Sequence, residues 1–193
     1  MRYEKGHKDA SRQRILGVAT ERFRTDGIAA TGLASIMSEA GLTNGAFYPH
    51  FKSKAALVRE SVEVAIEAQC NQIRDLLAEG GLERVIDIYL SPEHRDAPGL
   101  GCASAALLPE IAREPLDTRD AYTQRQRALV DVIADAMPEG TPDPHTLAIG
   151  LYATLIGTLE LSRAVSDPGF SGRILAAGAA AAKAMLATQG KRQ

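Results

Sequence analysis

Apolar residues recur at intervals of three and four along most of this chain, the spacing that places them on one face of an α-helix. Residues 11–27 are an example, and their apolar face consists of Ile15, Val18, Ala19 and Phe23. Alternation with period two, the signal of a half-buried strand, is scarce, and the aliphatic residues are mostly Ala, Leu and Ile. The pattern predicts an all-α fold.

Three short helices are predicted at the front of the chain. The first ends at Gly27, a residue type that commonly follows a helix. Thr31 is the candidate N-cap of the second helix and Gly41 is its stop, while Thr43 is the candidate N-cap of the third. The second helix carries its apolar residues at helical spacing, at Leu33, Ile36, Met37 and Ala40.

A longer fourth helix is predicted over 54–78, with Ser53 as its N-cap. At 1.5 Å per residue it is about 37 Å long, which is enough to join two domains. Its apolar stripe consists of Val62, Ile66, Ile73 and Leu77. Because no flexible linker precedes it, we predict one domain over 1–54 and a second over 55–193.

The rest of the chain has the pattern of helices separated by breakers. Gly80 and Gly81 precede a short helix that ends near Ser91, and loops are predicted over 93–101 and 138–144. The other predicted helices cover 103–114, with Pro109 inside it, then 116–137, 145–166 and 171–188.

Charge is distributed unevenly between the two predicted domains. Residues 1–60 contain 10 Lys and Arg against 6 Asp and Glu, whereas residues 61–193 contain 12 against 18. The net charge of −2 therefore conceals a basic front and an acidic back. That division indicates two functions in one chain.

The second and third helices, with the turn between them, have the pattern of a helix-turn-helix. Gly41 stands where the chain must turn sharply, and Leu42 is an apolar residue suited to fill the angle between the helices. A helix that enters the DNA major groove must present small and polar groups outward, and residues 43–46 (TNGA) do so. Phe47 and Phe51, four residues apart, are predicted to face inward.

Tyr48 and His50 lie between the two phenylalanines and face elsewhere. There they can donate to a phosphate or a base edge. The alternative, that they form a locally satisfied pair at the rim of the domain, stays open. Residues 42–51 (LTNGAFYPHF) thus have one face for the core and one for a partner.

Residues 14–58 resemble the DNA-binding domain of the tetracycline-repressor (TetR) family of transcriptional regulators. The landmarks that carry the resemblance are Phe23, Gly27, Ile36, Ala40, Gly41, Gly45, Tyr48, His50, Phe51, Ser53 and Lys54. Residues 101–114 and 157–168 resemble, more loosely, the variable ligand-binding and dimerisation domain of that family. The resemblance implies a three-helix DNA-binding domain followed by a helical effector domain.

The resemblance also implies which residues contact DNA. Thr43, Asn44 and Gly45 would open the recognition helix. Tyr48 and His50 would approach the backbone or base edges, and Thr31 belongs to the same set. Lys54 would meet a phosphate, which suits a lysine at a helix N-terminus, where the free amides also favour an anion.

Three positions depart from the family pattern. Gly32 stands where a Ser or Thr commonly donates to a phosphate. Ala34 replaces a longer side chain that often contacts a base, which shifts the reading of bases to the third helix. Pro49 lies late in that helix and has no amide to donate to the carbonyl of Gly45, so a kink or a 3₁₀ ending is expected there.

An enzyme is the main alternative from another class. The chain has no G-x-x-x-x-G-K-[ST], H-E-x-x-H or G-x-S-x-G motif, and its four histidines are scattered. We therefore expect no catalytic residue, no metal site and no cofactor. A pure dimerisation protein is the second alternative, but it does not explain the positive charge of residues 1–60.

Several features indicate a cytoplasmic protein that does not enter the membrane. The first residues are charged and lack the apolar core of a secretory signal. The longest apolar runs are interrupted by Glu160 and Lys183, which makes them too short and too charged to span a bilayer. Cys70 and Cys102 lie far apart and are expected to be two buried thiols.

The partners that we predict are double-stranded DNA with a palindromic operator, a small and mainly apolar effector, and a second copy of the chain. Repression is the usual mode of the family. Candidate effector contacts are Tyr89, Tyr122, Gln126 and Tyr152, although each also suits an ordinary core or surface position. The homodimer would use the last two helices, where close approach is allowed at Gly150, Ala153, Gly157, Gly178 and Ala181.

Overall fold

The computed structural model describes residues 2–187, with side chains from residue 8 onward. Over this range the chain forms helices and no strand, which confirms the all-α prediction. The elements are α1 (Arg2–Asp26), α2 (Leu33–Glu39), η1 (Asn44–Ala46, a 3₁₀ turn), α3 (Lys54–Tyr89), α4 (Pro92–Asp96), η2 (Pro98–Leu100, a 3₁₀ turn), α5 (Ala103–Ile111), α6 (Leu116–Asp135), α7 (Pro144–Ala164) and α8 (Pro168–Ala187).

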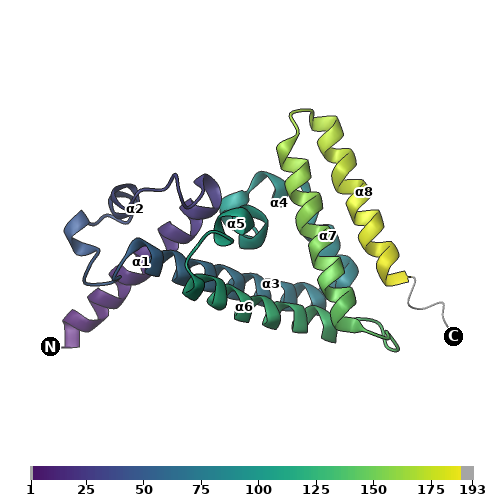
Figure 1. Ribbon diagram of the computed structural model, residues 1–193, viewed down its shortest axis with the longest axis horizontal. Helices are drawn as coiled ribbons and strands as arrows, with labels where there is room; N and C mark the ends of the chain where they lie inside the picture. The colour runs from purple at the N-terminus through teal and green to yellow at the C-terminus, as the bar shows by residue number, and fades with distance from the viewer. Residues whose placement is uncertain (1, 188–193) are drawn as a thin grey trace.

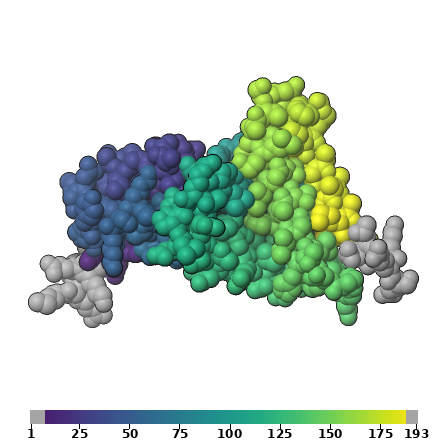
Figure 2. All heavy atoms as spheres, in the orientation of Figure 1, coloured from purple at the N-terminus to yellow at the C-terminus, as the bar shows by residue number. Residues whose placement is uncertain are grey.

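The helices are arranged along one long axis (Figure 1). Helices α1 and α2 and turn η1 form one end, and the α7–α8 pair forms the other. Helix α3 leaves the first group and runs through the middle of the molecule, with α6 packed along it. Helix α5 lies between α1 and α7 and contacts both. The space-filling view shows the same order of parts and places α7 and α8 far from the N-terminal group (Figure 2).

One hydrophobic core connects these parts. It begins with Phe23 of α1, continues through Val62 and Ile66 of α3, and reaches Leu155 of α7 and Ala182 of α8. Each of these residues is at most 4% exposed. Because the core is continuous, the N-terminal helices do not sit on a separate flexible linker.

Helix α3 contains the break that the sequence predicts at its glycine pair. Gly80 (φ −165°, ψ 22°) and Gly81 (φ 66°, ψ −162°) are both non-helical, so the helix is two straight segments joined at a kink. The positive φ of Gly81 favours a residue without a Cβ. At its start, the Ser53 side chain accepts a hydrogen bond from the Ala56 amide (3.1 Å), which confirms the predicted N-cap.

Two local predictions are wrong. Residues 93–101, predicted as a loop, contain α4 and η2. Pro92 is in the first turn of α4, where its missing amide costs nothing, and the Ser91 side chain caps the helix by accepting from the His94 amide (3.2 Å). The second is Thr31, which does not cap α2. The N-cap is Gly32, and the Thr31 hydroxyl donates to the Gly27 carbonyl (2.7 Å) instead.

The remaining helices follow their predicted ranges with small shifts at the ends. Helix α8 begins at Pro168, three residues before the predicted start, and residue 188 of the prediction lies outside the described residues. Pro109 lies inside α5 as expected. No helix in residues 2–187 is both long enough and apolar enough to cross a membrane.

Candidate functional site

The turn after α2 presents its leading residues to solvent. Thr43, Asn44 and Gly45 are all exposed, and η1 is a single 3₁₀ turn closed by a hydrogen bond from the Phe47 amide to the Asn44 carbonyl (3.2 Å). Thr43 occupies the N-cap position, but its side chain makes no capping bond. The third helix is thus shorter than predicted, although its first residues face outward as expected.

The chain beyond η1 continues as turns rather than as an α-helix. The amides of His50 and Phe51 both donate to the Phe47 carbonyl (2.9 and 3.0 Å). Pro49 has no amide to add to such a series, which is why a regular helix cannot extend through it. The 3₁₀ geometry expected near Pro49 therefore involves the whole third element.

The two phenylalanines pack the inner side of this turn against the core. Phe47 and Phe51 are 1% and 2% exposed, and their rings stack with centroids 5.7 Å apart. The guanidinium of Arg12 on α1 lies over the Phe51 ring (4.7 Å) and also pairs with Glu60 on α3. Leu42 packs against the same core. These contacts confirm the inward assignment of both rings.

Tyr48 and His50 differ in exposure. Tyr48 is 71% exposed, with its ring edge-on to Phe47. His50 is half-buried, and its Nδ1 atom is buried without a hydrogen-bond partner among the described residues. Burial lowers the pKa of His50, and the nearby cations Lys8 and Arg12 lower the pKa further. An imidazole beside two cations is therefore mostly neutral at neutral pH until an anion approaches.

Lys54 and Thr31 are both tied into the loop between α1 and α2. The Lys54 Nζ atom donates to the Ile28 carbonyl (2.6 Å), so one of its three donors is used inside the protein. Thr31 is buried and, through Gly27, holds the start of that loop. Glu110 of α5 accepts from the Ile28 and Ala29 amides (2.5 and 3.3 Å). The loop is thus clamped by a residue of the second half of the chain.

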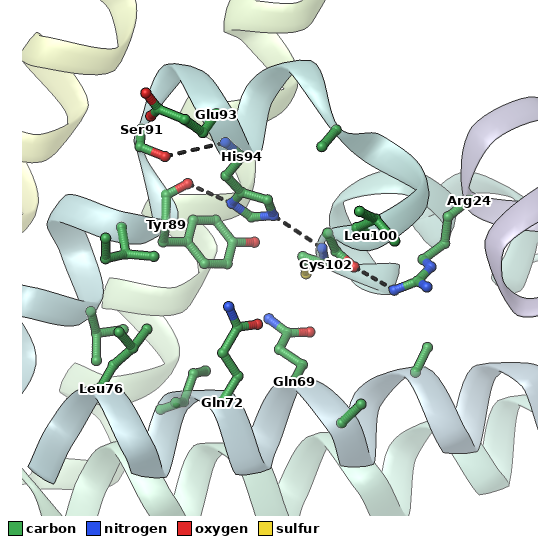
Figure 3. Close-up of a pocket in the computed structure, with 17 residues that line it drawn as sticks. Arg24, Gln69, Gln72, Leu76, Tyr89, Ser91, Glu93, His94, Leu100 and Cys102 are labelled. Carbon is green, nitrogen blue, oxygen red and sulfur yellow. Dashed lines mark hydrogen bonds between the residues drawn. The ribbon is translucent and has the colours of Figure 1, made fainter. Parts of the chain in front are cut away.

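A cavity of about 440 Å³ opens beside the first segment of α3 (Figure 3). Its aliphatic wall comes mainly from the two segments of α3, at Ala65, Ala68, Ile73, Leu76, Val85 and Ile88. Its polar lining includes Gln69, Gln72, Tyr89, His94 and Cys102. In Figure 3 both glutamines point up from α3 toward the side of the cavity that holds Tyr89 and Cys102. The volume is within the range of small-molecule sites, about 300–1,000 Å³.

His94 organises the upper wall of this cavity. Its Nδ1 atom contacts the Tyr89 carbonyl (2.7 Å), and its Nε2 atom accepts from the Cys102 amide (3.1 Å). The neutral ring with a proton on Nδ1 satisfies both contacts. Burial lowers the pKa of His94, against the opposing effect of the hydrogen bond to Tyr89. The neighbouring Gly101 leaves room for the ring, since a Cβ there would lie 2.5 Å from Nε2.

The predicted effector residues divide between the cavity and a neighbouring cluster. Tyr89 lines the cavity. The Tyr152 hydroxyl lies behind the wall, 3.2 Å from both the Gln69 Nε2 atom and the Cys102 thiol. Tyr122 and Gln126 instead bond Ser104 (3.0 and 2.5 Å) and do not line the cavity.

The sequence reasoning missed Gln69, Gln72, His94, Cys102 and Arg24 as cavity residues. One signal was present. The apolar stripe Val62–Ile66–Ile73 of α3 requires an inward residue near position 69, and that residue is a glutamine. A polar side chain in the middle of an apolar stripe indicates either a buried hydrogen bond or a ligand. His94 lay in the segment 93–101, which was predicted as a loop, and Cys102 directly follows that segment; nothing local marked either residue.

Arg24 links helix α1 to the cavity wall. It lies near the end of α1, lines the cavity, and donates from Nη1 to the Gly101 carbonyl (2.7 Å) and from Nε to the Thr20 carbonyl (3.0 Å). Close packing accompanies this contact, because a Cβ on Gly99 would overlap Thr25 of α1. A change in the cavity wall at 99–102 therefore reaches α1 directly.

Comparison with known proteins identifies the N-terminal part of the chain. Residues 15–61 match the family described as bacterial regulatory proteins of the tetR family. This segment is a TetR-family domain. The match covers α1, α2, η1 and the start of α3, which carry the exposed turn described above.

Relatives of this chain are transcriptional regulators, not enzymes. It is 41% identical over 64 residues to the regulator AcrR of Shigella flexneri (33% of this chain, 30% of AcrR), and 38% identical over 65 residues to the uncharacterised regulator YerO of Bacillus subtilis (34% of this chain, 22% of YerO). These matches thus span less than a third of either relative. The repressor KstR2 of Mycolicibacterium smegmatis is 25% identical over 168 residues, 82% of this chain and 80% of KstR2.

Solved structures show the same fold along nearly the whole chain. The reduced form of NemR from E. coli superposes with a TM-score of 0.75 at 22% identity, covering 90% of this chain and 95% of NemR. A TetR-family regulator from Agrobacterium tumefaciens gives a TM-score of 0.73 at 22% identity, covering 90% and 98%. The fold shared with these structures therefore extends over the helices of the second half of this chain as well.

Proposed function

We propose that the protein is a ligand-responsive transcriptional regulator that binds a palindromic operator as a dimer and is released from it by a small effector. The observation that carries the proposal is the exposed turn of Thr43, Asn44 and Gly45, supported from below by a buried phenylalanine pair. TetR-family proteins bind DNA operators and small-molecule effectors, typically as dimers. Repression is the mode named for relatives such as KstR2.

For the DNA contact, the turn acts as the part that enters the major groove. Asn44 offers an amide that pairs with a base edge, and Gly45 keeps the backbone close, since the space around its Cβ position is empty. Tyr48 and His50 follow on the same exposed side and contact the phosphate backbone. Lys54 keeps two donors beyond its bond to Ile28 for a phosphate.

For the effector, the cavity beside α3 is the binding site. Arg24 and Gly99 connect its wall to α1, and Glu110 connects α5 to the loop before α2. A ligand that shifts residues 99–102 therefore changes how the exposed turn is held. The coupling is reciprocal, so DNA must weaken the binding of the effector by the same factor. This route runs through short contacts, in addition to helix α3, which begins after the exposed turn and lines the cavity.

For the dimer, the outer face of α7 and α8 is the contact surface. Ile149 and Leu161 are 57% and 56% exposed on α7, and Ala153 and Gly157 lie between them at helical spacing, also exposed. Two of the five small residues predicted at the interface serve packing within the chain instead. Gly150 lies against Met185, and a Cβ on Gly178 would overlap Thr158. An exposed apolar stripe with small residues at its centre suits a two-fold contact.

The test is DNA binding by the purified protein to the DNA that flanks its own gene, by gel shift, with random DNA of equal length as control. Specific retention by a protein that is dimeric in light scattering is the expected result. Equal affinity for both DNAs would overturn the operator proposal. A monomer at micromolar concentration with intact specific binding would overturn the dimer alone.

A further inference from the structure

Two buried polar atoms at the cavity have no hydrogen-bond partner among the described residues. They are the Gln69 Oε1 atom and the Tyr89 hydroxyl, on side chains that are 8% and 6% exposed. Burying such groups without a partner is unfavourable, so proteins rarely leave them unpaired. Figure 3 shows the Gln69 amide and the Tyr89 ring reaching into the cavity from opposite sides.

The neighbouring groups cannot satisfy these atoms. The Gln69 Nε2 atom is used by Tyr152, so turning the amide over exchanges the unpaired acceptor for an unpaired donor. The Cys102 thiol is near enough to Tyr89 to contribute to the raised pKa of that hydroxyl, after burial, but no well-formed hydrogen bond joins them. A partner from outside the chain is required. It must donate to the Gln69 oxygen, and it can accept from the Tyr89 hydroxyl.

The groups around these two atoms are neutral. Burial raises the pKa of both Tyr89 and Tyr152, and burial lowers the pKa of His94. Two charged side chains also line the cavity, Arg24 and the exposed Glu93. Arg24 lies at the end toward α1 and donates to two carbonyl oxygens, and the Glu93 carboxylate points away from Gln69 and Tyr89 in Figure 3. A charged group placed between Gln69 and Tyr89 would therefore lose its hydration among neutral side chains.

We propose that the pocket binds an uncharged molecule with an aliphatic body and a single hydroxyl or primary amide group, and that this group is held between Gln69 and Tyr89. The inference rests on the effector role proposed above and specifies the chemistry of the effector. The hydroxyl of the ligand donates to the Gln69 Oε1 atom and accepts from the Tyr89 hydroxyl. The aliphatic body lies against Ile73, Leu76 and Ile88.

A matched set of ligands tests the headgroup. The set is octan-1-ol (donor and acceptor), heptyl methyl ether (acceptor only), octylamine (a cation) and octanoate (an anion), measured by calorimetry on the full chain without DNA. Octan-1-ol is expected to bind about 5-fold or more tighter than the ether, because the ether leaves the Gln69 oxygen unpaired. Octylamine and octanoate are expected to bind more weakly than the alcohol.

Two variants assign the two contacts. Tyr89→Phe keeps the ring and is expected to weaken octan-1-ol by about 3- to 10-fold while raising the melting temperature, since an unpaired buried hydroxyl is removed. Gln69→Met is expected to abolish the preference for the alcohol over the ether. The control is Tyr122→Phe, whose hydroxyl is paired with Ser104 outside the cavity. It should lower the melting temperature and leave octan-1-ol affinity unchanged.

The outcomes separate this inference from the regulator proposal. Tighter binding of octanoate than of octan-1-ol, or an unchanged affinity in Tyr89→Phe, overturns the headgroup assignment. Alcohol binding with the expected variant pattern but without any effect on operator affinity leaves the headgroup assignment intact and contradicts the effector role. If octanoate releases DNA and octan-1-ol does not, the effector role stands and the headgroup assignment is contradicted.

Discussion

Two tyrosines show how differently the exposed turn and the cavity are built. Tyr48, in the turn before α3, is 71% exposed and its hydroxyl is solvated before any partner arrives. Tyr89, in the cavity, is 6% exposed and its hydroxyl has no partner among the described residues. The exposed turn thus keeps the Tyr48 hydroxyl in water, whereas the cavity keeps the Tyr89 hydroxyl buried. Substitutions at the first site should change binding alone, and substitutions at the second should change binding and stability together.

The largest expected effect is loss of stability when the support of the exposed turn is removed. Phe51→Ala should lower the free energy of unfolding by about 3–5 kcal/mol, because a fully buried ring leaves a cavity. Tyr48→Ala, three residues away on the exposed side, should change stability by no more than about 0.5 kcal/mol. Urea unfolding of both variants measures this. Similar losses in the two would contradict the division between an inward and an outward face.

Loss of base contact comes next in size. Asn44→Ala should weaken operator binding by about 1–3 kcal/mol and relax specificity at one base pair per half-site, while random DNA is bound as before. The unfolding curve should not move, since Asn44 is exposed. Asn71→Ala, an exposed asparagine on α3, serves as the matched control and should bind the operator normally. Intact operator affinity in Asn44→Ala would show that the turn does not contact bases in the major groove.

A phosphate contact should have a smaller effect, seen in the salt dependence. Lys54→Ala should weaken operator and random DNA alike and reduce the slope of log affinity against log salt by about one counterion per subunit. Lys183→Ala, which removes a lysine paired with Asp87 at the other end of the molecule, should leave the slope unchanged. An unaltered slope in Lys54→Ala would restrict this lysine to its bond with the Ile28 carbonyl.

The smallest expected effect is a dependence of stability on pH through His94. Its pKa is lower in the folded protein than its ordinary value of 6.5, so the folded state binds the proton less well than the unfolded state. Stability is therefore complete above about pH 6.5 and falls as the pH drops toward the folded pKa. Melting curves between pH 8 and pH 5 should show this fall, with a shallower slope in His94→Gln.

His50, whose pKa is also lowered, contributes in the same direction. His50→Gln separates its share from that of His94. If both variants retain the full pH dependence of the wild-type protein, neither imidazole is responsible. Because phosphate oxygens favour the charged ring, DNA affinity should strengthen as the pH falls, and this effect should disappear in His50→Gln only.

The exposed turn was predictable because its information is local. Gly41, the phenylalanine spacing and the cap at Ser53 each act within a few residues, and all three behave as the sequence indicates. The prediction of Thr31 as an N-cap was wrong because its buried hydroxyl donates to the Gly27 carbonyl, four residues earlier, instead of accepting from the amides of α2. The length of the third helix was overestimated because Pro49 affects the whole element.

The pocket was less predictable because it is made of distant segments. Arg24, Gln69 and Cys102 meet only through the packing of α1, α3 and α5, and no spacing in the sequence encodes that meeting. Tyr122 and Gln126 had the right chemistry but bond Ser104 beside the cavity. Tyr89 was predicted and does line the cavity, and Gln69 was the missed residue that had a visible signal, an amide inside an apolar stripe.

The kink at Gly80 and Gly81 offers a simple way to change the lining of this pocket. Gln69 and Gln72 precede it and Val85, Ile88 and Tyr89 follow it, so a single helix supplies two walls of the pocket. One residue inserted or deleted at the glycine pair would rotate the second wall about the helix axis by about 100° relative to the first. Such a change would exchange every side chain of that wall at once while leaving residues 2–79, and the sequence read on DNA, unaltered. Effector choice could thus diverge between related genes by a three-nucleotide event, long before point substitutions accumulate in the pocket.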